Sequence, residues 1–129
     1  MAVSRGTFGA VRMRPGEDLI DGLHAFREEM AAEAMAVVSC VGSLADVVLR
    51  HAGRDAGTRM EGAFEIVSLV GTVDPEGHHL HLSIADGDGR VTGGAPDAGC
   101  DRAHDRGAGC RGVGRPALLA RALRGIGLP

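Results

Sequence analysis

The spacing of apolar residues predicts one amphipathic helix near the start of the chain, over residues 17–32. Apolar positions recur there every three or four residues, and acidic residues occupy the opposite face. Glu17 and Asp18 stand at the predicted start, where the positive end of the helix dipole favours a carboxylate. The expected buried face consists of Leu19, Ile20, Leu23, Phe26 and Met30.

From there to residue 94 the pattern is typical of strands joined by tight turns. The continuous apolar run at 34–41 favours a buried strand. Residues 64–73 alternate, so Ile66 and Val70 should share one face while Leu69 lies on the other. The sequence Asp-Pro-Glu-Gly at 74–77 is a turn signal, which predicts an antiparallel hairpin with the following strand. The predicted strands are 7–14, 34–41, 44–51, 64–73, 78–85 and a short one at 90–92.

This order of one strand, one helix and then a run of strands indicates an α+β fold with a mostly antiparallel sheet. The chain has 129 residues, which suits one domain. Only three residues are aromatic, all of them Phe, so the core is expected to be aliphatic.

Charge and composition narrow the function classes. The formal net charge is −3 and the sequence pI is about 6.0, so no overall positive field favours nucleic acid. Three scattered cysteines without a CxxC pair indicate a reducing compartment rather than a disulfide scaffold. We see no leader sequence and no apolar run of membrane-spanning length, so we expect no membrane partner and a cytoplasmic location.

The composition changes after Gly94. Residues 95–129 are rich in Gly, Ala and Arg, so we predict a tail that is irregular or partly helical over 116–128. We therefore divide the chain into a domain at 1–94 and a divergent tail at 95–129. A frameshift near codon 95 is our hypothesis for this break. Without its final strands the sheet would keep an unpaired edge, and we would expect aggregation rather than a discrete trimer.

Two histidines on one predicted strand are the clearest candidates for chemistry. His79 and His81 are two residues apart, so their side chains share a face and could supply two corners of a zinc site. Two ligands are too few to define a metal centre, and ordinary strand histidines at a surface or interface remain the alternative.

Several stretches resemble the PPC (plants and prokaryotes conserved) domain family. The similarity covers about residues 7–94, and Ala63 and Ala95 stand where family members usually have Arg and His. A shift of one nucleotide would restore that histidine after Gly94. The matching stretches are PGEDL at 15–19, GSL at 42–44, GxFEIxSLxG at 62–71, HLHLSxAD at 79–86 and GRVxGG at 89–94.

The resemblance implies an α+β subunit that assembles as a homotrimer, and partners that are double-stranded DNA or a transcription-related protein. It assigns Gly62, Phe64, Glu65 and Ile66 to a buried or assembling surface. A related fold occurs in acetolactate decarboxylase, which holds zinc through histidines. Three interpretations follow. The first is a non-enzymatic, DNA-associated assembly module. The second is a zinc-dependent small-molecule enzyme or binder that uses His79, His81 and a third group. The third is a non-functional product of the frameshift.

Overall fold

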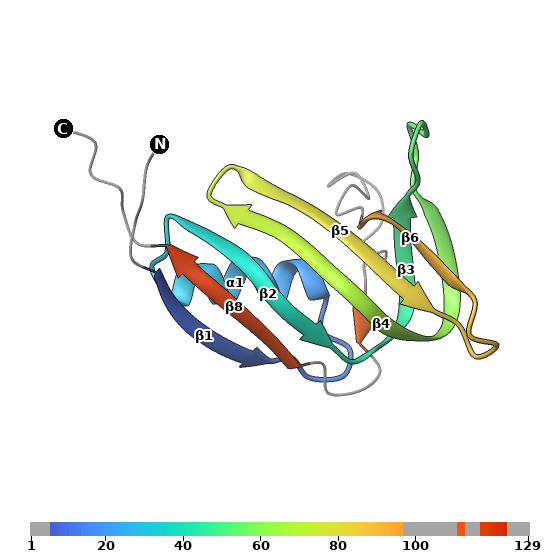
Figure 1. Cartoon of the computed structure of the whole chain (residues 1–129), viewed down its shortest axis with the longest axis horizontal. Coiled ribbons are helices and arrows are strands. Elements are labelled where there is room, and N and C mark those ends of the chain that lie inside the picture. Colours follow the sequence, from blue (N-terminus) through green and yellow to red (C-terminus); the bar gives the residue numbers. More distant parts are fainter. Residues whose placement is uncertain (1–5, 97–110, 113–116, 124–129) are drawn as a thin grey trace.

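The computed structural model describes residues 6–96, 111–112 and 117–123, which form one helix and a single sheet of eight strands (Figure 1). This architecture confirms the predicted α+β fold with a mostly antiparallel sheet. The elements are β1 (Gly6–Arg12), α1 (Leu19–Glu29), β2 (Ala34–Val41), β3 (Ser43–Arg50), β4 (Thr58–Asp74), β5 (Gly77–Ala85), β6 (Val91–Pro96), β7 (Arg111–Gly112) and β8 (Ala117–Leu123).

Helix α1 forms where the apolar spacing predicts it. The Asp18 side chain caps it by accepting hydrogen bonds from the backbone N–H groups of Ile20 (2.8 Å) and Asp21 (3.0 Å). The helix ends three residues before the predicted boundary because Ala31 adopts a left-handed backbone with φ 47°. Its buried residues are Leu19, Ile20, Leu23 and Phe26, as predicted. Within the described residues, this 11-residue helix is too short to cross a membrane.

The strands are ordered β1-β8-β2-β4-β5-β6-β3-β7, and every pairing is antiparallel. Strand β4 is long enough to pair with β3 through its first half and with β2 through its second half, while β5 lies alongside it from Glu65 onward. Because β3 also pairs with β6, strands β3, β4, β5 and β6 close a ring. Helix α1 covers one face of the sheet, behind β2 and β8 in Figure 1.

The tail prediction is wrong for two segments. Residues Arg111–Gly112 and Ala117–Leu123 are strands, and β8 lies between β1 and β2. Leu and Ala favour helices, but a segment between two strands can form backbone hydrogen bonds with both of them. These hydrogen bonds outweigh a weak local preference for helix. With β8 in place, the expected loss of the final sheet strand is also wrong. The frameshift hypothesis stays a prediction, as does the boundary at residue 94, although β6 runs two residues past it.

The predicted alternation of β4 is wrong beyond Ile66, because the strand contains a bulge. Its pairing with β5 shifts register between Ile66 and Ser68, so Val67 is an extra residue on β4. Beyond the bulge the faces exchange, because one inserted residue reverses a period of two. Leu69 is therefore buried beside Ile66, whereas Val70 is 53% exposed.

The core is aliphatic, as the composition predicted. Phe26 is the one buried aromatic ring among the described residues, and Phe64 packs partly against the core. Strand β2 is buried on one face only, because Val38 and Val41 are exposed; the prediction of a wholly buried strand is wrong there. The largest of the fully buried side chains are Leu19, Leu23, Met35, Leu44, Leu49, Leu82, Ile84, Val47 and Val73.

Candidate metal site and assembly surface

His79 and His81 share the face of β5 that points away from the core, as the sequence predicted. They alternate with the buried residues Leu80 and Leu82, and both imidazoles are exposed. Their Nε2 atoms are 3.3 Å apart and their ring centroids 5.3 Å apart. Tetrahedral zinc with ordinary Zn–N bonds separates two ligand nitrogens by about 3.3–3.4 Å. The pair therefore has the spacing of two neighbouring zinc ligands.

A third ligand is not found beside this pair. Among the residues that the structure describes, no three His, Cys, Asp or Glu side chains come together. Strand β6 pairs with β5 as far as Gly94 opposite Leu82, so Ala95 is the next residue along, on the side of His81. His104, another possible donor, lies outside the described residues. The donor set on this subunit thus fits two corners of a metal site.

An apolar surface lies on the same face of the sheet. Val70 is opposite His81 and Thr72 is opposite His79 in the pairing of β4 with β5. Four of the exposed valines, at positions 38, 41, 67 and 70, are chain neighbours of buried residues of their strands, so the alternation turns them away from the core. Val91 is opposite Ala85, the neighbour of buried Ile84. Phe8 precedes Gly9, which faces Phe26 of α1. We call this set the open-face patch: Phe8, Val38, Val41, Val67, Val70 and Val91.

The four residues assigned to a buried or assembling surface take different positions on β4. Ile66 is 7% exposed and belongs to the core, and Phe64 is partly buried against it. Glu65 is exposed and accepts a hydrogen bond of 2.8 Å from Ser43 Oγ on β3. Gly62 is exposed with φ 152°, a backbone conformation that favours glycine. Within the subunit, two of the four therefore serve the core and two face outward.

The structure contains a second pair of neighbouring imidazoles, which the sequence did not predict. His24 on α1 and His78 on β5 approach to 3.1 Å between Nε2 and Nδ1. His78 lies on the helix side of the sheet, with Leu80, because its position alternates with that of His79. These residues are 54 positions apart in the chain, so only the packing of α1 on the sheet brings them together.

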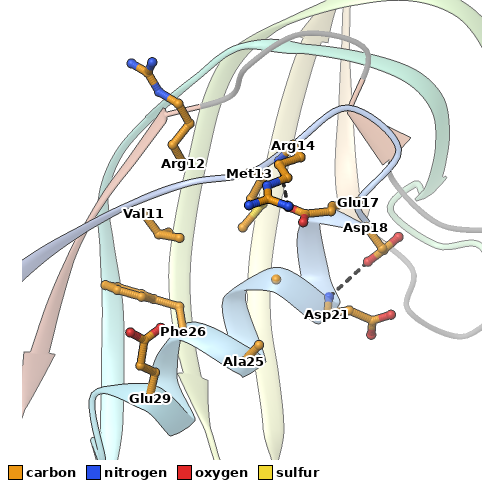
Figure 2. Close-up of a pocket in the computed structure, with 11 residues that line it drawn as sticks. Val11, Arg12, Met13, Arg14, Glu17, Asp18, Asp21, Ala25, Phe26 and Glu29 are labelled. Atoms are coloured by element: carbon orange, nitrogen blue, oxygen red, sulfur yellow. Dashed lines mark hydrogen bonds between the residues drawn. The ribbon is translucent and has the colours of Figure 1, made fainter.

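A hollow of about 460 Å³ lies between β1 and α1 (Figure 2). Its floor is apolar: Val11 and Phe26 lie between strand and helix, whereas the Arg12 side chain points away from the helix. Arg14 faces it with several carboxylates, of which Glu17 accepts a hydrogen bond of 2.7 Å from the Arg14 backbone N–H. Because carboxylates outnumber cations here, the hollow suits a neutral or cationic ligand better than a phosphate. The lining carboxylates are Glu17, Asp18, Asp21 and Glu29.

Two further polar groups have structural roles. Asp86 closes a hairpin turn, in which its Oδ1 accepts from the backbone N–H groups of Asp88 and Arg90, each at 2.9 Å. Residues 86–89 are therefore a hairpin turn. Cys40 is 6% exposed, and burial raises the pKa of its thiol to about 11, so it is an inert core residue.

Comparison with known proteins identifies the fold and its relatives. A family model described as the Plants and Prokaryotes Conserved (PCC) domain matches residues 2–104, beyond the predicted end at 94. The bifunctional protein GlmU of Synechococcus sp. strain JA-3-3Ab is 39% identical over 90 residues, which are 70% of this chain. The chain spans only 14% of the length of that relative.

Solved structures of other proteins share the fold of this chain. A Salmonella enterica protein described as hypothetical superposes with a TM-score of 0.84 and 35% identity, over 95% of this chain and 81% of its own. Two further proteins share the fold. A metal-containing protein of Archaeoglobus fulgidus superposes with a TM-score of 0.70 and 23% identity, over 97% of this chain and 87% of its own. A PPC protein of Pyrococcus horikoshii superposes with a TM-score of 0.69 and 20% identity, over 97% of this chain and 86% of its own.

Two further structures with this fold come from proteins provisionally described as DNA-binding. The protein from Bacteroides thetaiotaomicron has a TM-score of 0.63 and 16% identity, over 88% of this chain and 81% of its own. The protein from Ralstonia eutropha has a TM-score of 0.64 and 12% identity, over 88% of this chain and 76% of its own. With the family model covering most of its length and the Salmonella structure matching nearly all of it, the chain belongs to the Plants and Prokaryotes Conserved (PPC) domain family.

Proposed function

We propose that the chain is a self-assembling PPC module that works as a homotrimer, in association with DNA or a transcription-related protein. The observation that supports assembly is the open-face patch. Its members are 50–63% exposed, and α1 covers the other face of the sheet (Figure 1). Burying the remaining exposed half of a valine contributes about 1 kcal/mol. Several such residues per subunit are enough to favour association.

Light scattering coupled to size exclusion tests the assembly. The expected mass of the native protein is about three times the 13.2 kDa of one chain. Val70→Asp, in the open-face patch beside His81, should shift the protein to monomers because association would then bury an unpaired charge. Ala52→Asp, on the exposed loop after β3, is the matched control and should leave the trimer intact. A native protein that stays monomeric at the highest concentration measured would refute the proposal.

The association with DNA is supported by the two relatives described as DNA-binding, and the charge distribution limits how it can occur. Residues 6–96 contain seven arginines and fourteen acidic residues, a formal charge of −7. Residues 97–129 contain six arginines and three acidic residues. Direct phosphate contacts therefore depend on the later segment, and a protein partner is the alternative.

A titration with duplex DNA at two salt concentrations separates these cases. If phosphate contacts carry the binding, affinity falls steeply with salt, and Arg102→Ala combined with Arg106→Ala weakens it. The matched control is Arg90→Ala, because that guanidinium already pairs with Asp86 and Asp88. If no salt-dependent binding is seen at micromolar protein, the DNA association is wrong and the protein partner remains.

The second candidate function is zinc binding at His79 and His81, as part of a small-molecule binder or enzyme. The 3.3 Å separation of the two Nε2 atoms favours it, and one fold relative is described as metal-containing. A bound zinc would supply a Lewis acid, and the two imidazoles would hold it, with a third group from water or from another subunit.

Metal analysis of the purified protein tests this candidate. Stoichiometric zinc that is lost in His81→Ala supports it. His51→Ala is the control, since that imidazole contacts the Gly93 carbonyl oxygen instead. Native protein that stays metal-free after incubation with zinc would exclude it.

A further inference from the structure

His24 and His78 form a contact that neither the assembly nor the His79–His81 pair explains. Their facing nitrogens, Nε2 and Nδ1, are 3.1 Å apart, the ring centroids are 5.4 Å apart, and the planes cross at 65°. One imidazole comes from α1 and the other from β5, and both are half-buried. The rings therefore point their nitrogens at each other across the boundary between helix and sheet.

We propose that His24 and His78 are a second bis-imidazole site, which takes a borderline divalent cation such as Zn²⁺ and ties α1 to β5. Tetrahedral zinc needs about 3.3–3.4 Å between ligand nitrogens, so the pair has to open by a few tenths of an ångström. The facing nitrogens lie on the line that joins the two ring centroids, so each ring also has to turn until both lone pairs meet at one ion. Binding also requires that both facing nitrogens lack a proton. Each neutral ring then keeps its single proton on the outer nitrogen, His24 Nδ1 or His78 Nε2, so a change of tautomer is sufficient.

The charges around His24 favour a cation. Asp21 and Glu28 lie one turn to either side of it on α1, at i−3 and i+4, on the same side of the helix. Arg27 is also nearby, but its guanidinium is directed at the Ala32 carbonyl oxygen (2.9 Å) and at the Glu28 carboxylate. The carboxylates raise the local cation concentration without joining the donor set.

Two nitrogen donors determine which metal binds and how tightly. Imidazole nitrogens suit Zn²⁺ and Cu²⁺, whereas Mg²⁺ and Ca²⁺ prefer oxygen. No third His, Cys, Asp or Glu completes the site within the described part of the chain, so water must fill the other positions. A cation bound here joins two elements that are apart in the unfolded chain, and therefore stabilises only the folded state.

Thermal unfolding of the full chain with and without ZnCl₂ tests the site. The background variant is His79→Ala with His81→Ala, which removes the other pair. In this background we expect Zn²⁺ to raise the Tm, with MgCl₂ at the same concentration having no effect. At 100 times the Kd the gain corresponds to about 2.7 kcal/mol. Adding His24→Gln or His78→Gln should abolish the rise, whereas adding His51→Gln should not.

A spectroscopic measurement keeps the test independent of stability. Cu²⁺ added to the background variant should show electron paramagnetic resonance couplings to two nitrogens, and these should drop to one in His24→Gln. If Zn²⁺ does not raise the Tm of the background variant, or the rise persists in His24→Gln, the proposal is wrong. Neither result bears on the trimer, whose mass is measured without metal, so the two proposals fail separately.

Discussion

Gly71 offers the sharpest test of the sheet that positions the histidines. It pairs with Val37 on β2 and with Leu80 on β5, in the middle of the sheet. Its φ is +133°, a conformation that L side chains rarely adopt. A Cβ placed there would overlap the carbonyl oxygen of His79 and lie 2.9 Å from the Cα of Leu80. Alanine at this position must therefore strain its own backbone and separate β4 from β5.

The two effects can be summed. A left-handed backbone costs alanine about 1–2 kcal/mol, and the overlap adds about 1–3 kcal/mol, as overpacking does elsewhere. We therefore expect Gly71→Ala to lower the free energy of unfolding by about 2–5 kcal/mol. For a chain of this size that corresponds to a fall in Tm of roughly 6–25 °C. The displaced His79 carbonyl group would also disturb the His79–His81 pair.

Gly53→Ala is the matched control. Gly53 has φ +71°, but no atom lies within 4 Å of the Cβ it would gain. Its substitution should cost only the backbone strain, about 1–2 kcal/mol. Urea denaturation followed by circular dichroism, at one protein concentration, measures both variants. Equal losses in the two would refute the argument, because the overlap with β5 would then contribute nothing.

Two further predictions concern the helix cap and the buried thiol. Asp18→Ala should lower the free energy of unfolding by about 1 kcal/mol, since two backbone N–H groups lose their acceptor, while Asp18→Asn should be close to native; equal losses in the two would contradict the capping role. For Cys40, burial raises the pKa from 9.0 to about 11, so the unfolded thiol ionises first as the pH rises. The free energy of unfolding should therefore fall between pH 9 and 11, and a Cys40→Ala variant with the same pH dependence would show that this thiol is not the cause.

Local patterns determined a large part of this molecule. Helix α1 follows from the spacing of its apolar residues and from a carboxylate at its start, both of which act within a few residues. The shared face of His79 and His81 follows from the period of two in any strand. The hairpin between β4 and β5 follows from turn chemistry, since Asp74 accepts hydrogen bonds from the backbone of Glu76 and Gly77.

Long-range contacts decided the rest, because their partners are invisible in a short window of sequence. Ala117–Leu123 is a strand since β1 and β2 flank it, although its own composition favours a helix. The bulge at Val67 moves Val70 onto the open face, and only the pairing with β5 reveals that extra residue. His24 and His78 are 54 positions apart in the chain, and they meet only because α1 packs against the sheet. Local periodicity determines which face of its own element a side chain occupies. The tertiary packing of the whole chain determines which other residues that side chain contacts.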